Sequence, residues 1–235
     1  TSGRHQVAAK SPLTGIFGEG DVGGQWGTAL KATGYDGLVV EGCADRLVYL
    51  LIRGDAPGEA ELYNADDLRG LDTFATSDRL RERHGKNASV SCIGQAGEKL
   101  LPIACIAHDG ENARMAGRCG LGAVMGSKRL KAVVAVGSRT PSIADPDRFA
   151  RQQKSALSRL VEMTMSLKLY GTAGGVVGAE QMGDLPVRNW QTGNWPQGAE
   201  KLSGILLRDT ILRKNYYCTS CPIGCGRDVE IADGP

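Results

Sequence analysis

Glycine clusters place the strongest constraint on what this chain can fold into. Of its 235 residues, 33 are glycine, which is about twice the usual share in a globular protein. The glycines are clustered rather than periodic, which argues against both a collagen helix and a flexible linker. Glycine permits positive φ angles and lets the backbone approach a ligand closely. The clusters therefore predict a globular protein whose main-chain amides hold a large ligand.

The charge and hydropathy of the sequence exclude several classes of protein. The 28 basic and 26 acidic residues give a formal net charge of +2, and no basic stripe supports nucleic-acid binding. No apolar run approaches the roughly 20 residues that cross a bilayer, and the polar start shows no signal peptide. We therefore expect a cytoplasmic protein with no membrane span. The missing initiator Met, and an end just after a cysteine cluster, predict that both ends continue in a longer protein.

The pattern of apolar runs predicts an α+β protein with two domains, residues 1–142 and 143–235. Short runs rich in Val, Ile and Leu, bounded by Gly, Pro or Asp, are typical of strands, and they make the first domain β-rich. The expected strands are His5–Lys10, Asp36–Glu41, Leu47–Arg53, Ala88–Ile93 and Lys131–Gly137. A short helix is expected over Thr76–His84, capped by Thr76 or Ser77 and ended by Gly85.

A long helix is predicted to open the second domain. Asp145 supplies an N-cap and Pro146 the first helical position. Apolar residues then recur at helical spacing from Phe149 to Leu167, and Gly171 ends the run. The loops that follow are polar and rich in glycine. The second domain is therefore expected to be helical.

Cys218, Cys221 and Cys225 form a C-x₂-C-x₃-C sequence. A tight loop with this spacing can point three thiolates at one iron–sulfur cluster or at one metal ion, and thiolate ligands select iron–sulfur or zinc. Pro222 and Gly224 favour an irregular turn whose amides can donate to cluster sulfurs. The pattern favours an iron–sulfur cluster, with zinc and a chance cluster of buried cysteines as alternatives. A fourth ligand is expected beyond this sequence, because the other four cysteines are expected to be packing residues.

Two glycine-rich segments, residues 11–27 and 114–128, are candidates for the ligand-binding loops. The first has no Gly-x-Gly-x-x-Gly before a helical pattern and no Lys-Ser/Thr after its glycines, so the Rossmann and P-loop interpretations fail. In the second, Arg114 and Arg118 are four residues apart and can share one helical face, where guanidinium groups suit phosphate. Either loop alone is equally well explained as a structural turn, but both together, with the cysteine triplet, favour a ligand.

These segments resemble, in the same order, those of the aldehyde:ferredoxin oxidoreductase family of tungsten–pterin enzymes. The resemblance extends over essentially the whole chain, and its most specific part is Ala116–Lys128. The other matching segments are 11–15 (Ser-Pro-Leu-Thr-Gly), 18–24 (Gly-Glu-Gly-Asp-Val-Gly-Gly), 34–37 (Gly-Tyr-Asp-Gly), 185–190 (Leu-Pro-Val-Arg-Asn-Trp) and the cysteine triplet.

The resemblance implies a tungsten or molybdenum ion held by two pterins beside a [4Fe-4S] cluster, with Mg²⁺ as a candidate bridge between pterin phosphates. It also implies a β-rich, two-sheet amino-terminal domain that carries the pterins, followed here by the first part of a helical domain. Three positions match cluster ligands: Cys218, Cys221 and Cys225. Arg4 matches an arginine placed between pterin and cluster. The matching pterin contacts are Asp21, Gly23, Arg114, Met115, Gly117 and Arg118.

Two of these positions depart from the family pattern. Asp21 stands where the family often has Asn, and it adds negative charge near phosphates unless a cation bridges it. Met115 stands where the family often has Ala, which is harmless if the contact is made by the backbone. The family's acid–base residues near the metal have no counterpart in this chain, so no catalytic residue is assigned and the chain alone is expected to be incomplete for activity.

The resemblance implies an oxidoreductase of anaerobic metabolism. Such an enzyme converts an aldehyde and water to a carboxylate and passes electrons through the cluster to ferredoxin or an electron-transfer subunit. The cofactor carries the difficult chemistry, while protein donors orient it. Two alternatives stay open: the tungsten subunit of an aromatic-ring-reducing complex similar to benzoyl-CoA reductase, and a non-catalytic iron–sulfur electron-transfer module. Assembly into a homo-oligomer is also left open.

Overall fold

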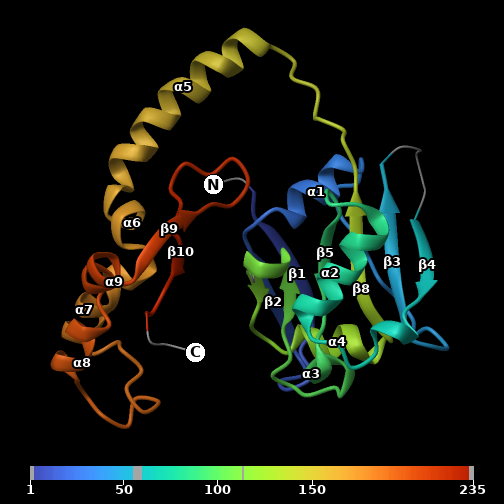
Figure 1. Ribbon diagram of the computed structural model, residues 1–235, viewed down its shortest axis with the longest axis horizontal. Helices are drawn as coiled ribbons and strands as arrows, with labels where there is room; N and C mark the ends of the chain where they lie inside the picture. Colours follow the sequence, from blue (N-terminus) through green and yellow to red (C-terminus); the bar gives the residue numbers. More distant parts are fainter. Residues whose placement is uncertain (1–2, 55–59, 113, 233–235) are drawn as a thin grey trace. The chain divides into compact units, whose positions relative to one another are not determined.

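The computed structural model describes residues 3–54, 60–112 and 114–232. The chain divides into two compact units, Ser2–Ser142 and Ile143–Pro235, and each is described by itself. Strands dominate the centre of the first unit and helices dominate the second (Figure 1), so the α+β class predicted from the sequence is confirmed. None of the helices in the described ranges combines the length and apolar character that a bilayer span requires.

A six-stranded mixed sheet forms the centre of the first unit. Its strands are β3 (Val48–Arg53), β4 (Ala60–Asn64), β5 (Ser89–Cys92), β6 (Ile106–His108), β7 (Arg114–Ala116) and β8 (Leu130–Val136). Their spatial order is β4-β3-β8-β5-β6-β7. Only β3 and β8 run parallel, and the other neighbours in the sheet are antiparallel. Strand β8 is buried along almost its whole length, which explains why all of its residues except Lys131 are apolar.

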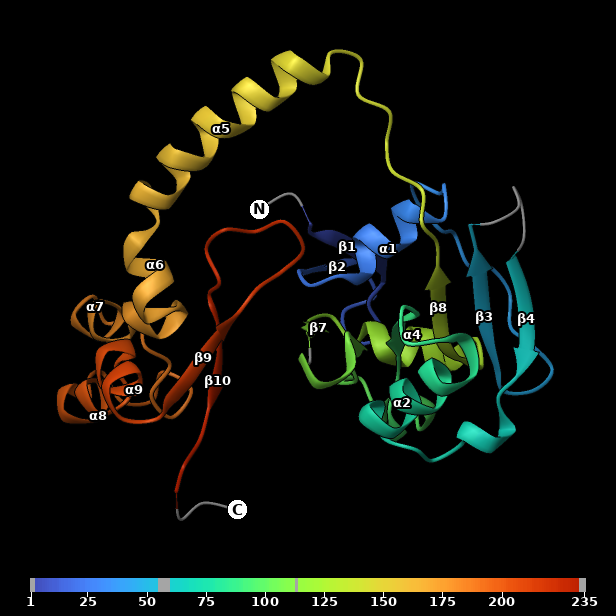
Figure 2. The ribbon, with the colours of Figure 1, turned by 45° about the horizontal axis from the view of Figure 1, so that its top comes forward.

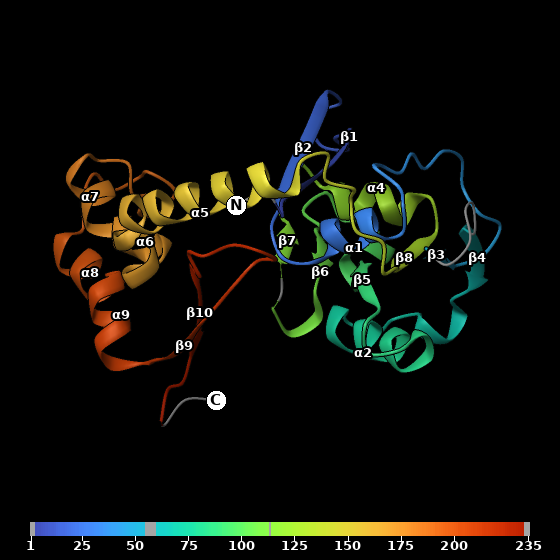
Figure 3. The same ribbon diagram turned by 90° about the horizontal axis from the view of Figure 1, so that it is seen from above.

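A separate two-stranded sheet pairs β1 (His5–Lys10) with β2 (Phe17–Val22) in antiparallel register. The view from above shows this pair projecting beyond the six-stranded sheet (Figure 3). Four helices complete the unit: α1 (Trp26–Ala32), α2 (Thr73–His84), α3 (Gln95–Glu98) and α4 (Leu121–Ser127). Short 3₁₀ turns lie at Asp66–Leu68 and Gly110–Asn112. The first unit thus holds two sheets, as the resemblance implies.

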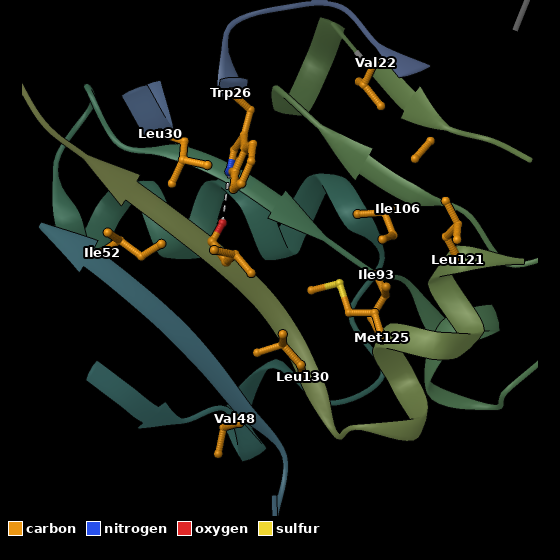
Figure 4. Close-up of a cluster of buried hydrophobic side chains, with 12 residues drawn as sticks. Val22, Trp26, Leu30, Val48, Ile52, Ile93, Ile106, Leu121, Met125 and Leu130 are labelled. Atoms are coloured by element: carbon orange, nitrogen blue, oxygen red, sulfur yellow. Dashed lines mark hydrogen bonds between the residues drawn. The ribbon is translucent and has the colours of Figure 1, made fainter. Parts of the chain in front are cut away.

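The six-stranded sheet has a hydrophobic core on each face. Side chains alternate across a strand, so the even-numbered apolar residues of β3 enter one core and the odd-numbered ones enter the other. The first core contains residues of α1, α4 and the end of β2 (Figure 4). In it, the indole Nε1 of Trp26 donates to the Val133 carbonyl at 3.3 Å, which fixes α1 against β8. The second core lies under α2.

The second unit is mainly helical. Its elements are α5 (Pro146–Met163), α6 (Met165–Tyr170), a 3₁₀ turn (Thr172–Gly175), α7 (Val176–Gln181), α8 (Pro196–Lys201), α9 (Gly204–Thr210), and the antiparallel strands β9 (Leu212–Tyr216) and β10 (Gly226–Val229). The carboxylate of Asp145 accepts from the Arg148 amide at 2.9 Å and Pro146 opens the helix, so the predicted start of α5 is confirmed.

Three of the individual helices and strands expected from the sequence differ in the structure. The long helix is interrupted between α5 and α6 (Figure 2), where the Thr164 hydroxyl donates to the Leu160 carbonyl at 2.6 Å and so competes with the helical pattern. Asp36–Glu41 forms no strand, and its apolar residue Val39 is 86% exposed.

Helix α2 begins at Thr73, earlier than predicted. The Asp72 carboxylate accepts from the Ala75 amide at 2.8 Å, so Asp72 caps the helix in place of the predicted Thr76 or Ser77.

Lys131 places a charge inside the first unit. Its side chain is fully buried on β8. The ammonium donates to the Leu71 carbonyl at 2.9 Å and forms an ion pair with Glu98 of α3. Glu98 also accepts from the Gly70 amide at 3.0 Å. The pair therefore joins β8, α3 and the loop before α2. Breaking a buried pair leaves an uncompensated charge, whereas replacing both partners by apolar groups is often nearly neutral.

We expect Glu98→Gln to destabilise the full-length protein by about 3–5 kcal/mol, because Lys131 stays buried without its counter-charge. Adding Lys131→Met should restore most of this loss. The matched control is Glu82→Gln, which breaks the exposed Arg79–Glu82 pair and should cost less than about 1 kcal/mol. Thermal and denaturant unfolding followed by circular dichroism measure these differences. Equal effects of the two single substitutions would contradict the role of the buried pair.

Two histidines link β1 to the six-stranded sheet. His5 Nε2 lies 3.1 Å from His108 Nε2, and His108 Nδ1 lies 3.3 Å from the Arg114 carbonyl. A carbonyl only accepts, so His108 carries its proton on Nδ1. The single lone pair of its Nε2 is then the acceptor for His5 or for the Ser91 hydroxyl, which lies 3.0 Å away. Burial lowers the pKa of His108 to about 3, with the neighbouring His5 adding to the effect. Burial, and then the charge of Arg4, lowers the pKa of His5 to about 4.

This pair makes stability depend on pH. Both folded-state pKa values lie below the ordinary value of 6.5, so the unfolded chain binds more protons than the folded chain below that pH. The stability present near neutrality is therefore lost as the pH falls from about 6.5 towards 4.

The variant His5→Gln keeps a donor towards His108 but does not titrate. We expect its unfolding temperature to fall less steeply than that of the wild type across this range. The less buried His84, changed to Gln, should alter the slope less, and parallel curves for His5→Gln and wild type would refute the assignment.

Candidate functional site

The first glycine segment supplies a strand, a tight turn and a helix. Strand β2 ends at Val22, the buried residues Gly23 and Gly24 follow, and α1 begins at Trp26. We expected no helical pattern after the glycines of this segment, and α1 shows that this expectation was wrong. Gly24 has a φ of 92°, which a residue with a side chain rarely adopts. The turn therefore depends on glycine at this position.

Arg4 and Asp21 lie together at this turn. One guanidinium nitrogen of Arg4, Nη2, donates to the main-chain oxygen of Asp21 at 3.0 Å. Both side chains are exposed, so the guanidinium retains donors that face solvent while its position is fixed by the loop. Residues 4 and 21 are distant in sequence, and the antiparallel pairing of β1 with β2 brings them together.

The second glycine segment runs directly beside the first. Arg114 and Met115 lie in β7, which pairs with β6, and α4 begins only at Leu121. Arg114 and Arg118 therefore do not share a helical face, and that prediction was wrong because pairing with β6 extends the chain there. Gly117 and Arg118 follow β7 and are exposed.

Small residues allow the two segments to pack closely. A Cβ atom on Gly20 of β2 would lie 3.2 Å from the Cβ of Ala116 in β7. A Cβ atom on Gly18 would lie 2.7 Å from the Cβ of Cys119, closer than real contacts allow. At Gly24 an added Cβ would lie 2.9 Å from Arg114 Cγ. Five of the predicted site positions, Arg4, Asp21, Gly23, Arg114 and Met115, thus lie on neighbouring strands and turns of one unit.

Asp109 was not among the predicted site residues. It follows β6 with a φ of 64°, and its carboxylate accepts from the Gln25 amide at 2.7 Å. Burial raises the pKa of Asp109, while the hydrogen bond from Gln25 and the charge of Arg114 act in the opposite direction. The sequence signal was the Asp-Gly turn pair after the buried strand β6, but its partner is distant along the chain.

The three predicted cluster ligands lie on the loop between β9 and β10 in the second unit. Cys218, Cys221 and Cys225 are half-buried, and the Cys221 amide donates to the Cys218 carbonyl at 3.1 Å. Gly224 has a φ of 61°, and an added Cβ there would overlap the Tyr217 ring. In the described part of the chain, no three His, Cys, Asp or Glu side chains converge in position for one metal ion. The cysteine ligands therefore stay a prediction.

Arg227 anchors this loop. Its guanidinium donates to the carbonyls of Gly224 and Gly226 on one side, at 2.9 and 3.1 Å. On the other side it donates to the carbonyls of Leu167 and Lys168, at 3.3 and 2.9 Å, at the end of α6. One planar, multi-donor group thus joins the cysteine loop to the carbonyl end of a helix. Two other cysteines, 43 and 119, are exposed, so the expectation that all four remaining cysteines are packing residues was wrong.

Comparison with known proteins identifies relatives over nearly the whole chain. The family described as aldehyde ferredoxin oxidoreductase, N-terminal domain, matches residues 1–137, and domains 2 and 3 of that family match residues 149–235. A tungsten-containing aldehyde ferredoxin oxidoreductase of Pyrococcus furiosus is 40% identical over 97% of this chain and 37% of its own length. An aliphatic sulfonate oxidoreductase, WOR-like subunit, of the same organism is 30% identical over 97% of this chain and 38% of its own length.

A solved structure shares the fold. It is the active-site complex BamBC of benzoyl coenzyme A reductase with 1,5-dienoyl-CoA, and it is similar at a TM-score of 0.76 and 24% identity, over 99% of this chain and 37% of that chain. The chain thus spans a little over a third of the length of the relatives it matches. The two family matches, together with the relative at 40% identity, show that the chain belongs to the aldehyde ferredoxin oxidoreductase family.

Proposed function

We propose that this chain is the cofactor-binding portion of a tungsten–pterin oxidoreductase that oxidises aldehydes to carboxylates. Electrons would leave through an iron–sulfur cluster to ferredoxin or an electron-transfer subunit. The observation that carries the proposal is the convergence of Arg4, Asp21 and Arg114 on the packed glycine segments of a family-matched unit. The relatives named as tungsten-containing enzymes support the metal.

The residues at this site fit an anionic pterin cofactor. Exposed Arg4 and Arg118 and half-buried Arg114 offer guanidinium donors suited to phosphate and to planar heterocycles. The exposed Gly117 leaves its backbone open to close approach by a ligand, whereas Gly23 is buried in the turn and would act by shaping it. When bound, a tungsten bis-pterin would supply the redox chemistry of the aldehyde carbon. This chain's own residues would bind and orient the pterins, Arg4 being held for that purpose by the Asp21 carbonyl.

Asp21 adds a negative charge to the proposed site. Its side chain is exposed beside the predicted phosphate positions, where a second anion would repel phosphate. A divalent cation such as Mg²⁺ prefers carboxylate, carbonyl and phosphate oxygens, so it would convert this repulsion into a bridge. Met115, exposed in β7, contributes main-chain atoms and needs no particular side chain for that role. Cys218, Cys221 and Cys225 would supply three of the cluster ligands.

The two alternative functions have less support. The likeness to the benzoyl-CoA reductase complex is one of fold, whereas the aldehyde oxidoreductases are similar in sequence at 38–40% identity. A non-catalytic electron-transfer module would not need the two packed glycine segments. We therefore place aldehyde oxidation first, with the identity of the aldehyde unassigned.

The function is tested on the full-length protein purified without oxygen from cells supplied with tungstate. We expect tungsten and pterin in stoichiometric amounts, broad visible absorption that dithionite bleaches, and reduction of ferredoxin on addition of short aldehydes. Cys221→Ser should lose the visible absorption and ferredoxin reduction, because a cluster ligand is removed. Cys43→Ser, which changes an exposed thiol outside the loop, is the matched control and should change neither. A colourless protein with stoichiometric zinc would refute the cluster, and a loaded protein inactive on aldehydes would refute the reaction.

Arg4 is expected to serve both cofactors. Arg4→Lys keeps the charge but loses the planar fork of donors, so the full-length variant should retain tungsten and cluster yet show a shifted cluster reduction potential, since hydrogen bonds to cluster sulfurs help to set it. Arg4→Ala should in addition lower pterin content. Arg79→Ala, which removes an exposed arginine from α2, should do neither. Wild-type potential, tungsten content and turnover in both Arg4 variants would mean that Arg4 is only a surface residue.

A further inference from the structure

The first glycine turn is held to the second glycine segment by one side chain. Asp109 Oδ2 accepts from the Gln25 amide at 2.7 Å, and Oδ1 lies 3.5 Å from the Ser89 hydroxyl. The Trp26 amide also bonds to this carboxylate. Gly24 lies directly against it, and an added Cβ at Gly24 would overlap Oδ2. The carboxylate therefore occupies the space that the missing side chain of Gly24 leaves.

The backbone of Asp109 is fixed on the other side. Its amide donates to the Val90 carbonyl of β5 at 3.3 Å, and its carbonyl accepts from the Asn112 amide at 3.2 Å. The preceding residue, His108, donates to the Arg114 carbonyl. Asp109 is thus embedded in the turn that leads from β6 into β7, where Arg114 and Met115 lie.

This contact also determines where phosphate can bind. The amides at the start of a helix attract anions, but here the amides of Gln25, the residue before α1, and of Trp26, its first residue, donate to the Asp109 carboxylate. No cap is supplied by the Gln25 side chain itself. A cofactor phosphate must therefore use other donors, such as the arginines. The Asp109 carboxylate thus accepts the hydrogen bonds of the glycine turn that an anionic ligand would otherwise accept.

Resting on the proposed function, we infer that Asp109 is a positioning residue for the pterin site. It holds the turn at Gly23 and Gly24 at a fixed spacing from the segment that carries Arg114, so that donors from both segments can contact one cofactor. Asp109 does not touch the cofactor, because its carboxylate is directed at the amides of α1. Gly24 is its complement, since no larger residue leaves room for the carboxylate.

The test compares two aspartates that cap helices, in the full-length protein. Asp109→Ala should lower the pterin and tungsten content per protein by about tenfold, the order expected when support behind a ligating group is removed, with the visible absorption of the cluster retained. Asp109→Asn keeps an acceptor oxygen and should restore most of the pterin. Asp72→Ala removes the cap of α2, lowers stability comparably, and should leave pterin content unchanged. Extracted-pterin fluorescence and elemental analysis give the two contents.

The outcomes separate the two claims. A wild-type protein without pterin overturns the proposed function, and this inference with it. A loaded wild type with an equally loaded Asp109→Ala variant overturns the inference alone, as does equal pterin loss in Asp72→Ala. If Asp109→Ala does not accumulate as folded protein, Asp109→Ser decides, because its shorter side chain removes the carboxylate from the Gln25 amide while leaving Gly24 and its backbone conformation unchanged. Loss of pterin with the cluster retained supports the inference, and full pterin content refutes it.

Discussion

The close approach of β2 and β7 is the constraint on which the proposed site depends. At Gly18 and Gly20 the backbone of one strand lies against Cys119 and Ala116 of the other segment, with no room for larger side chains. Close packing of this kind transmits any added volume to the neighbouring backbone. These two buried glycines are therefore needed for packing within the protein, and that packing brings together the segments that carry the proposed site residues.

Electrostatics would give the proposed site its selectivity. The Asp109 carboxylate accepts from the amide of Gln25, the residue before α1, and the Asp21 carbonyl accepts from Arg4. The positive charges left to face a ligand are guanidinium groups, whose rigid forks distinguish a planar heterocycle or phosphate better than a point charge does. Burial lowers the pKa values of His5 and His108, so these two side chains add no competing cation near neutral pH.

The residues that could be predicted from the sequence carry a local signal. Asp145 and Pro146 define the start of α5, and the His5–Lys10 run defines β1, because caps and alternation act within a few residues. The spacing of Arg114 and Arg118 led to a wrong prediction of a shared helical face, because a four-residue interval fits a helix as well as it fits a strand and turn. Only pairing with β6 makes the start of this segment a strand. Asp109 was missed for the same reason: its partners, Gly24 and Gln25, are adjacent only after β2, β6 and β7 have assembled.

Both units use an arginine to hold main-chain carbonyls. A guanidinium has donors and no acceptor, so it can fix a loop only through that loop's carbonyls. Arg4 does this at Asp21, and Arg227 does it at Gly224 and Gly226 beside the cysteines. At the cysteine loop, holding the carbonyls leaves main-chain amides as the donors available to the cluster sulfurs of the proposed site. At the glycine turn the Gln25 amide is held by Asp109, so there the guanidinium of Arg4 is itself the donor left for a phosphate.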